Sequence, residues 1–434
     1  MKLKKYRIDD IADLNRSCIS KIDTISDIEY LDTSNITENV IFDTYMLNID
    51  NAPSRAQRKV SDKTILYSTV RPRLKHYGIL NSPKDNFIVS TGFVTIDIKE
   101  QYKEEIDATY LYLLLTQPSI TEYISNIADT AVSSYPSINP SDIASIEFKF
   151  PSYGIQKLVA NIWSAFDRKI ELNRAINQNL EAMAKQLYDY WFVQFDFPNE
   201  EGKPYKSSGG TMVWNEKLKR EIPKGWNISL IKDIATTYSG GTPKSTNIEY
   251  YNNGDIAWIN SGELNSPIIT KTTNYITKCG LENSSAKLYP SNSILVAMYG
   301  ATAGKVSLLT FEACSNQAVC GVIPTIENML YYVYFHISSL YSHFITLSTG
   351  SARDNISQDT IKNILLFIPT RNILKLFDEK IGNIYQTIVN NYQQIDSLTK
   401  QRDELLPLLM NGQVSVNSDL SVYKKAKERK KSPP

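Results

Sequence analysis

The chain repeats part of its own sequence at a constant distance. Residues 137–151, SINPSDIASIEFKFP, align without a gap with residues 355–369, NISQDTIKNILLFIP, at an offset of 218 positions. The match continues downstream, for example at Ile170 and Ile388. This period is much longer than the repeat of a solenoid, so it indicates the duplication of a whole domain together with the helix that follows it.

A long helical pattern follows each repeated segment. Apolar residues recur at intervals of three and four over 153–194, and the same spacing returns over 371–412. Such a narrow apolar seam is typical of a coiled-coil partner, so we expect the two helices to bury their seams against each other. Asn173 and Asn391 fall at equivalent seam positions, where an Asn commonly sets the register; a solvated Asn is the alternative.

The remaining sequence divides into two mixed domains and two linking segments. Residues 1–152 and 226–370 each combine short strand-like runs with a helical stretch, which predicts α+β domains. Residues 195–225 are rich in Gly, Pro, Ser and charge, and this composition indicates a connector. The basic residues 413–434 are expected to form a flexible tail.

Composition excludes several classes of protein. The chain of 434 residues has a formal net charge of +1, so any nucleic-acid binding has to come from local patches. Its 4 Cys and 3 His have no spacing typical of metal ligands, so we expect no metal and no cofactor. No signal peptide opens the sequence, and the apolar runs are too short to span a membrane. We therefore expect a soluble cytoplasmic protein.

Two fragments imitate enzyme motifs. GATAGKV at 300–306 resembles a phosphate-binding loop, but it has three residues between its glycines where four are needed, and a Val replaces the metal-binding hydroxyl. EFK at 147–149 has the carboxylate–x–lysine form of some nucleases, but its repeated counterpart at 365–367 is apolar. The sequence therefore predicts no active site.

A basic cluster in the first domain favours nucleic acid. Residues 55–75, RAQRKVSDKTILYSTVRPRLK, hold seven cations and one acid, Asp62, which gives 7 − 1 = +6. Arginines in loops beside strands suit contacts with a duplex backbone and with guanine edges, whereas a solvated basic face is the alternative. The candidate DNA contacts of this domain are Arg55, Arg58, Lys59, Arg71, Arg73 and Lys75.

The second domain offers a glycine-rich loop instead. SGGTPKS at 239–245 carries bare backbone amides, a hydroxyl and a lysine, which can approach phosphates closely, although tight turns use the same residues. A packed core position is the alternative for Tyr299, and a turn cap is the alternative for Ser261. The candidate DNA contacts of this domain are Gly241, Thr242, Lys244, Ser261, Tyr299 and Arg353.

An ordered series of segments resembles the specificity subunits of type I restriction–modification systems. The second domain resembles a target-recognition domain of this family through EIPKGW at 221–226, SGGTPKS at 239–245, YYNNGDIAWINSGEL at 250–264, SILVAMYGATAGKVSLL at 293–309 and TGSARDNISQDTIKNILLFIP at 349–369. The first domain resembles one through SRAQRKV at 54–60, ILYSTVRPRL at 65–74 and SYPSINPSDIASIEFKFP at 134–151. It lacks the Pro-x-Gly-Trp entry and the GGTP loop. The resemblance covers about residues 1–415.

The resemblance implies a non-catalytic subunit that reads DNA. Its fold would be α+β, with two globular target-recognition domains joined by two long antiparallel coiled-coil helices in a pseudo-two-fold tandem duplication. Each domain would read one half of a split, asymmetric site in double-stranded DNA. Two copies of the methyltransferase subunit would dock on the helices, on faces around Arg168, Glu171, Asn177 and Tyr188, and the restriction and translocation subunits would join that core.

The length of the helices limits the DNA site. A helix on the order of 55 Å corresponds to roughly 16 base pairs, an upper bound on the separation of the half-site centres. Two other interpretations stay open at this point. One is a coiled-coil scaffold whose globular ends bind protein, and the other is a silent recombination-donor copy without DNA specificity of its own.

Overall fold

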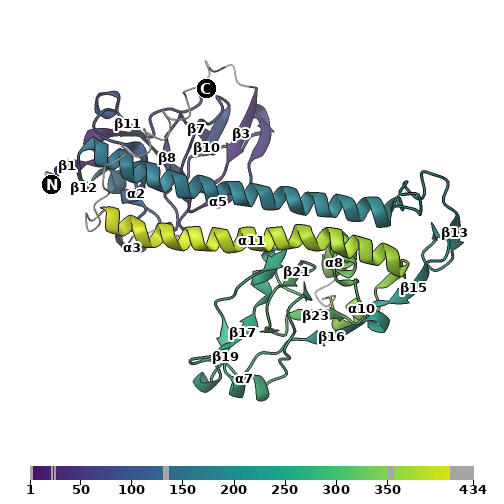
Figure 1. Cartoon of the computed structure of the whole chain (residues 1–434). Helices are drawn as coiled ribbons and strands as arrows, with labels where there is room; N and C mark the ends of the chain where they lie inside the picture. The colour runs from purple at the N-terminus through teal and green to yellow at the C-terminus, as the bar shows by residue number, and fades with distance from the viewer. Residues whose placement is uncertain (1–2, 21–22, 24–25, 131–135, 350–355, 411–434) are drawn as a thin grey trace, which may run out of the picture. The chain divides into compact units, whose positions relative to one another are not determined.

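The computed structural model describes residues 3–20, 23, 26–130, 136–349 and 356–410. It divides into two compact units. The first unit is Met1–Arg168 with Gln401–Pro434, and the second is Lys169–Lys400. Among the described helices, none is both long enough and apolar enough to cross a membrane. Figure 1 labels many of the elements of each unit.

The first unit contains two four-stranded sheets. The strand orders are β2-β11-β8-β9 and β6-β3-β10-β7. All pairs are antiparallel except β3 with β10, which run parallel. The strands are β2 (Ala12–Leu14), β3 (Asp27–Leu31), β6 (Tyr45–Asn48), β7 (Ala56–Lys59), β8 (Ile65–Ser68), β9 (Tyr77–Ile79), β10 (Phe87–Ser90) and β11 (Phe93–Ile98).

The second unit has a five-stranded sheet and a three-stranded sheet. Their orders are β16-β23-β20-β21-β18 and β19-β17-β22. β17 runs parallel to β22, and β18 runs parallel to β21. The strands are β16 (Ala235–Ser239), β17 (Ile256–Ile259), β18 (Ile268–Ile269), β19 (Tyr275–Ile276), β20 (Ser293–Ala297), β21 (Val306–Leu309), β22 (Cys314–Ser315) and β23 (Val319–Pro324).

The two units repeat one topology. The order β2-β11-β8-β9 corresponds to β16-β23-β20-β21, and the parallel pair β3-β10 corresponds to β17-β22. β7 adjoins β10 in the first unit and has no counterpart beside β22 in the described part of the second. Both units then continue through matching helices. These are α2 (Ala108–Leu115), α3 (Pro118–Asp129) and α4 (Pro140–Ala144) in the first, and α8 (Leu330–Ser339), α9 (Tyr341–Thr349) and α10 (Gln358–Lys362) in the second.

A two-stranded ladder ties each domain to the start of its long helix. β1 (Lys4–Arg7) pairs with β12 (Glu147–Phe150), and β15 (Asn227–Leu230) pairs with β24 (Leu365–Ile368). Short helical turns, α1 (Ile8–Ile11) and α6 (Ile231–Ile234), then lead from β1 and β15 into the sheets. The duplicated segment recognised in the sequence is therefore the end of a complete repeated domain.

The long helices are α5 (Tyr153–Tyr188), which ends in a π-helical turn, and α11 (Arg371–Met410). In the second unit, Asn391 Nδ2 donates to Asn177 Oδ1 at 2.8 Å, and Asn173 Nδ2 donates to Gln394 Oε1 at 3.3 Å. One helix advances in sequence as the other retreats, so they run antiparallel. In the first unit, Arg402 contacts Asp167 at 3.7 Å. The predicted packing of the two helices is confirmed, and the polar residues lie in the seam.

Two residues of the predicted docking face lie in the core instead. Asn177 and Tyr188 are each 3% exposed. Asn177 bonds with Asn391 across the seam, and the Tyr188 ring stacks on Phe335 at 5.5 Å. Ile176, the apolar neighbour of Asn177, is instead 38% exposed. The prediction was wrong because it followed apolar residue types, whereas the buried seam of α5 keeps a seven-residue spacing that passes through the polar Asn177, between Ile170 and Ala184.

The segment predicted as a connector is folded onto the second unit. Phe195 and Phe197 are buried, and both rings contact Trp226, at 5.7 Å and 5.0 Å. A hairpin of β13 (Met212–Asn215) and β14 (Arg220–Pro223) follows. The connecting residues therefore form part of the hydrophobic core that anchors α11. The predicted tail at 413–434 lies outside the described residues.

Candidate nucleic-acid interface

Four strands of the second unit end at the same edge. β16 and β20 are both antiparallel to β23, and their last residues, Ser239 and Ala297, pair with Cys320 and Val319 at the start of that strand. β17 is parallel to β22, which leads into the turn before β23. The loops that follow these strands therefore gather together. We call them the second loop edge, which consists of residues 240–244, 260–265, 298–305 and 316–318.

Hydrogen bonds join the loops of this edge. The Asn316 amide donates to Ile259 O at 3.0 Å, and the Met298 amide donates to Ala318 O at 2.8 Å. The Thr302 hydroxyl donates to Ser261 O at 2.9 Å. The structure thus brings the predicted loops around Thr242, Ser261 and Tyr299 together on one surface.

The glycine pair serves packing rather than open amides. The Gly241 amide donates to Ser315 O at 2.8 Å, and the Gly240 amide donates to Val319 O at 3.0 Å. A Cβ on Gly241 would lie 2.6 Å from the carbonyl carbon of Ser285. Contrary to the sequence prediction, these amides are not open to a phosphate. The pair instead lets two backbone segments pack closely.

The other predicted residues of this domain differ in accessibility. Thr242 and Lys244 are exposed, whereas Ser261 and Tyr299 are half-buried. Tyr299 packs against the core, and burial raises its pKa. Ser261 begins the short helix η7 (Ser261–Asn265). Arg353 lies outside the described residues.

The first unit has a corresponding edge, which follows β2, β3, β8 and β10. We call it the first loop edge; it includes residues 32–35, 69–76 and 91–92. The Thr91 amide donates to Arg55 O at 2.8 Å, and the Thr69 amide donates to Gly92 O at 2.9 Å. Arg55 and the loop that carries Arg71, Arg73 and Lys75 therefore meet at the turn between β10 and β11.

The basic cluster divides into paired and unpaired cations. Arg73 contacts Asp129 at 2.6 Å, and Lys75 contacts Glu38 at 2.5 Å, both at exposed positions. Arg55 is exposed, and among the described residues its guanidinium has no ion pair or hydrogen bond. It is therefore the residue of this edge most available to a ligand.

Three further members of the cluster have distinct surroundings. Lys59 contacts Asp23 at 2.5 Å, and the hydrogen bond from Lys59 lowers the pKa of Asp23. Arg58 is half-buried on β7, and its Nε is buried without a hydrogen-bond partner in the described part of the chain. Arg71 has a left-handed backbone, with φ of 49°, and its amide donates to Pro136 O at 2.9 Å.

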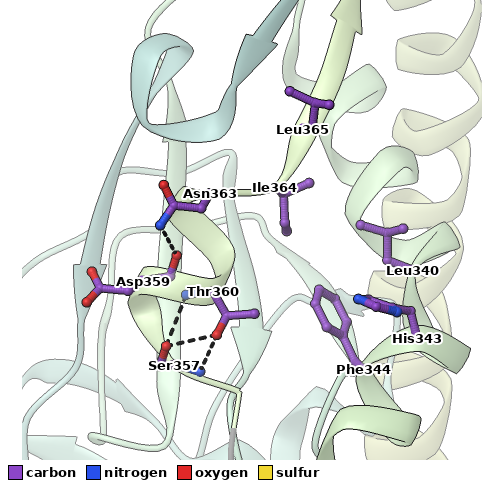
Figure 2. Close-up of a pocket in the computed structure, with 9 residues that line it drawn as sticks. All are labelled: Leu340, His343, Phe344, Ser357, Asp359, Thr360, Asn363, Ile364 and Leu365. Atoms are coloured by element: carbon purple, nitrogen blue, oxygen red, sulfur yellow. Dashed lines mark hydrogen bonds between the residues drawn. The ribbon is translucent and has the colours of Figure 1, made fainter. Parts of the chain in front are cut away.

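The described part of the second unit includes two cavities. One of about 590 Å³ lies between α10 and the α8–α9 region (Figure 2). Its polar side is the cap of α10, where the Ser357 hydroxyl accepts from the Thr360 amide at 3.0 Å. A second cavity, of about 350 Å³, is lined by residues that include Tyr251, Trp258 and Tyr275. Among the described residues, no cluster of His, Cys, Asp or Glu could hold a metal ion.

Sequence reasoning missed the turn between β22 and β23. Asn316 and Gln317 lie there, in the middle of the second loop edge, and Thr242 donates its hydroxyl proton to Gln317 Oε1. Gln317 is exposed. The only signal in the sequence was a pair of amide residues between two apolar runs, which is also common in ordinary turns.

Comparison with known proteins finds one family over most of the chain. The model described as the type I restriction modification DNA specificity domain matches residues 2–182 and 223–405. The HindI specificity subunit of Haemophilus influenzae is 26% identical over 95% of this chain and 99% of its own length. The MjaIX specificity subunit of Methanocaldococcus jannaschii is 27% identical over 84% of this chain and 83% of its own.

A solved structure shares the fold. The crystal structure of a type I restriction–modification S subunit from M. genitalium matches with a TM-score of 0.57 and 16% sequence identity. The match covers 94% of this chain and 96% of that one. The duplicated domains with their long helices are therefore an arrangement known from an experimental structure.

Proposed function

The chain belongs to the type I restriction–modification DNA specificity family, and on that premise we propose that its two domains each read one half of a split, asymmetric site in double-stranded DNA. The chain is a specificity subunit, the non-catalytic member of a type I restriction enzyme that recognises the DNA target. Its division into two matched domains supports a target of two parts, because each domain carries its own loop edge.

The observation that carries the proposal is the match between the two edges. In both units, loops follow equivalent strands of one topology and converge on the turn before β11 or β23. The residues at these turns differ, because Thr91 and Gly92 stand where the second unit has Asn316 to Ala318. Equivalent positions with different side chains are what two different half-sites require, because side chains read base edges.

We further propose the partners of the complex. Two methyltransferase subunits would dock along α5 and α11, and the restriction and translocation subunits would join them. α5 carries large apolar side chains that face solvent, with Leu172 59% exposed and Met183 56% exposed. Arg168 and Glu171 are exposed near them. Such a mixed surface favours a protein partner.

Methylome sequencing tests the proposal. A methylation-deficient host would carry this chain together with its neighbouring methyltransferase gene. We expect methylated adenines in one split, asymmetric motif that disappears when this chain is omitted. A soluble complex that methylates no new motif would contradict the proposal, and would favour a scaffold or a silent copy.

A further inference from the structure

The turn 316–318 occupies the centre of the second loop edge. Backbone hydrogen bonds attach it to Ile259, at the end of β17, and to Met298, and the Gly241 amide bonds Ser315 O directly before it. Because these bonds use main-chain groups, they hold the turn in place without occupying the side chain of Gln317. That side chain is exposed. A rigid turn with a free polar tip is a suitable place for a group that reads a ligand.

The two amide side chains of the turn have different roles. Both polar atoms of the Asn316 side chain form hydrogen bonds. Its Nδ2 donates to Asn260 Oδ1 at 3.2 Å, and its Oδ1 accepts from the backbone amide of Ala318 at 3.1 Å. Gln317 Oε1 accepts the Thr242 hydroxyl proton, which fixes the orientation of the amide. Among the described residues, Gln317 Nε2 has no hydrogen-bond partner. Gln317 therefore keeps a free donor and a second lone pair on Oε1.

The glycine pair explains how Thr242 reaches Gln317. A Cβ on Gly240 would lie 2.5 Å from Ser315 O, so only glycine allows the loop to approach the strand that leads into the turn. The approach places Thr242 beside Gln317. The SGGT segment thus acts as a support for the amide, which is a more specific role than a generic phosphate loop.

We propose that Gln317 reads an adenine in the half-site of the second domain and that Thr242 is its positioning residue. A Gln amide can donate to adenine N7 and accept from the adenine N6 amino group in the major groove. The inference rests on the proposed function, because it requires that the second loop edge meets DNA. The turn of the first loop edge consists of Thr91 and Gly92 and carries no Asn or Gln side chain, so the assignment applies to one half-site only.

The test compares variants in the methyltransferase complex that contains this chain. For Gln317→Ala, competition binding with duplexes that carry each base pair at each position of the second half-site should show lost discrimination at one A·T pair. The expected loss is about 5- to 140-fold. The first half-site should be read as before. Thr242→Ala should give a smaller loss at the same pair, and Thr242→Ser should restore it.

The matched control is Gln101→Ala, an exposed glutamine in the short helix η4 (Glu100–Tyr102), which lies beyond the far end of β11. It should leave every position unchanged. Co-elution of the Gln317→Ala chain with the methyltransferase, with the first half-site still recognised, shows that the variant is folded.

Each other result would overturn the inference. A loss at a G·C pair would exclude adenine reading, and an equal weakening of all sequences would indicate a phosphate contact. Discrimination unchanged within about twofold would exclude base reading by Gln317. If the wild-type chain directs methylation to no DNA motif, the proposed function would be overturned, and this inference with it. A wild-type motif that survives Gln317→Ala unchanged overturns the inference alone.

Discussion

The two domains share a strand order but differ in the residues that they place at the first and the second loop edge. The first places arginines there, through the extra strand β7 and the loop after β8, and three cations of its basic cluster are paired with carboxylates. The second places a glycine pair, a threonine and a glutamine there. Buried apolar strands therefore preserve the topology, while the loops change the chemistry presented to a ligand.

Gly240→Ala should have the largest effect on stability and should destabilise the second domain alone. The new Cβ would meet the backbone of Ser315 and Asn316, which cannot move aside by rotating a side chain. We expect the free energy of unfolding of the second unit to fall by about 3 kcal/mol. Hydrogen exchange resolved by mass spectrometry would show β22 and β23 opening while the first unit stays protected.

Two matched glycines sharpen this comparison. A Cβ on Gly262, on the same edge, would meet nothing within 4 Å, so Gly262→Ala should change stability by less than about 0.5 kcal/mol. A Cβ on Gly92, in the first domain, would lie 2.8 Å from Thr33 Cγ2, which can rotate away, so we expect about 1 kcal/mol. Equal effects at all three positions would contradict the close-approach argument.

Acid should destabilise the second domain before the first. Aligned at an offset of 222, α2 and α8 place Leu114 opposite His336. Burial lowers the pKa of His336 from 6.5 to about 4, so the folded state favours the neutral ring. The unfolded state binds the proton more readily, and stability falls as the pH drops from about 6.5 toward 4. The loss at pH 4 should be about 3 kcal/mol.

Urea unfolding at pH 7 and pH 4.5 would measure this difference. His336→Leu should make the free energy of unfolding of the second unit less dependent on pH. The variant also loses the hydrogen bond between His336 Nε2 and Leu365 O, which should lower that free energy by the same amount at every pH. An unchanged pH dependence in that variant would show that another group causes the acid sensitivity.

Arg55→Ala should change reading by the first domain without changing its stability. Arg55 is unpaired in the described structure, so its loss costs no ion pair. We expect about 1–3 kcal/mol of lost discrimination at one position of the first half-site, if the guanidinium contacts a guanine. Competition binding checks the prediction. Lys103→Ala, beyond the opposite end of β11, is the charge-matched control and should leave discrimination unchanged.

Variants in the seam between α5 and α11 should have the smallest effect on the free energy of unfolding. They test the pair of Asn177 and Asn391, which lies in the second unit. Asn391→Leu leaves Asn177 Oδ1 without its donor, at a cost of about 1–2 kcal/mol. The double variant Asn177→Leu, Asn391→Leu removes both polar groups and should lie within about 1 kcal/mol of the wild type. A double-mutant cycle by urea unfolding measures the coupling. Additive effects would show that the two amides do not depend on each other.

Much of the architecture could be predicted from the sequence. The constant offset predicts a duplicated domain, and the spacing of apolar residues predicts both long helices and their mutual packing. The helical stretch predicted in each domain corresponds to α2 with α3 in the first and to α8 with α9 in the second. These features depend on local periodicity, which can be read from a single sequence.

The site was predicted only in part, because its contacts link distant residues. The sequence places Arg73 and Lys75 in one basic cluster, but Arg73 pairs with Asp129 and Lys75 with Glu38. Gly241 was expected to present an open amide, but that amide binds Ser315 O. Gln317 had only a weak local signal, because a pair of amide residues between apolar runs is also common in ordinary turns.

The order of residues alone is enough to establish that this protein consists of two similar domains, each followed by a long helix that must bury an apolar seam. The duplication follows from the constant offset of the repeat, and the long helices follow from hydrophobic periodicity, which acts between near neighbours in the chain. Which polar groups remain free at each loop edge depends instead on contacts between residues that are distant in the chain. The loops meet because strands far apart in the sequence pair with β11 and β23, and each hydrogen bond or ion pair formed there removes one candidate from the groups available to DNA.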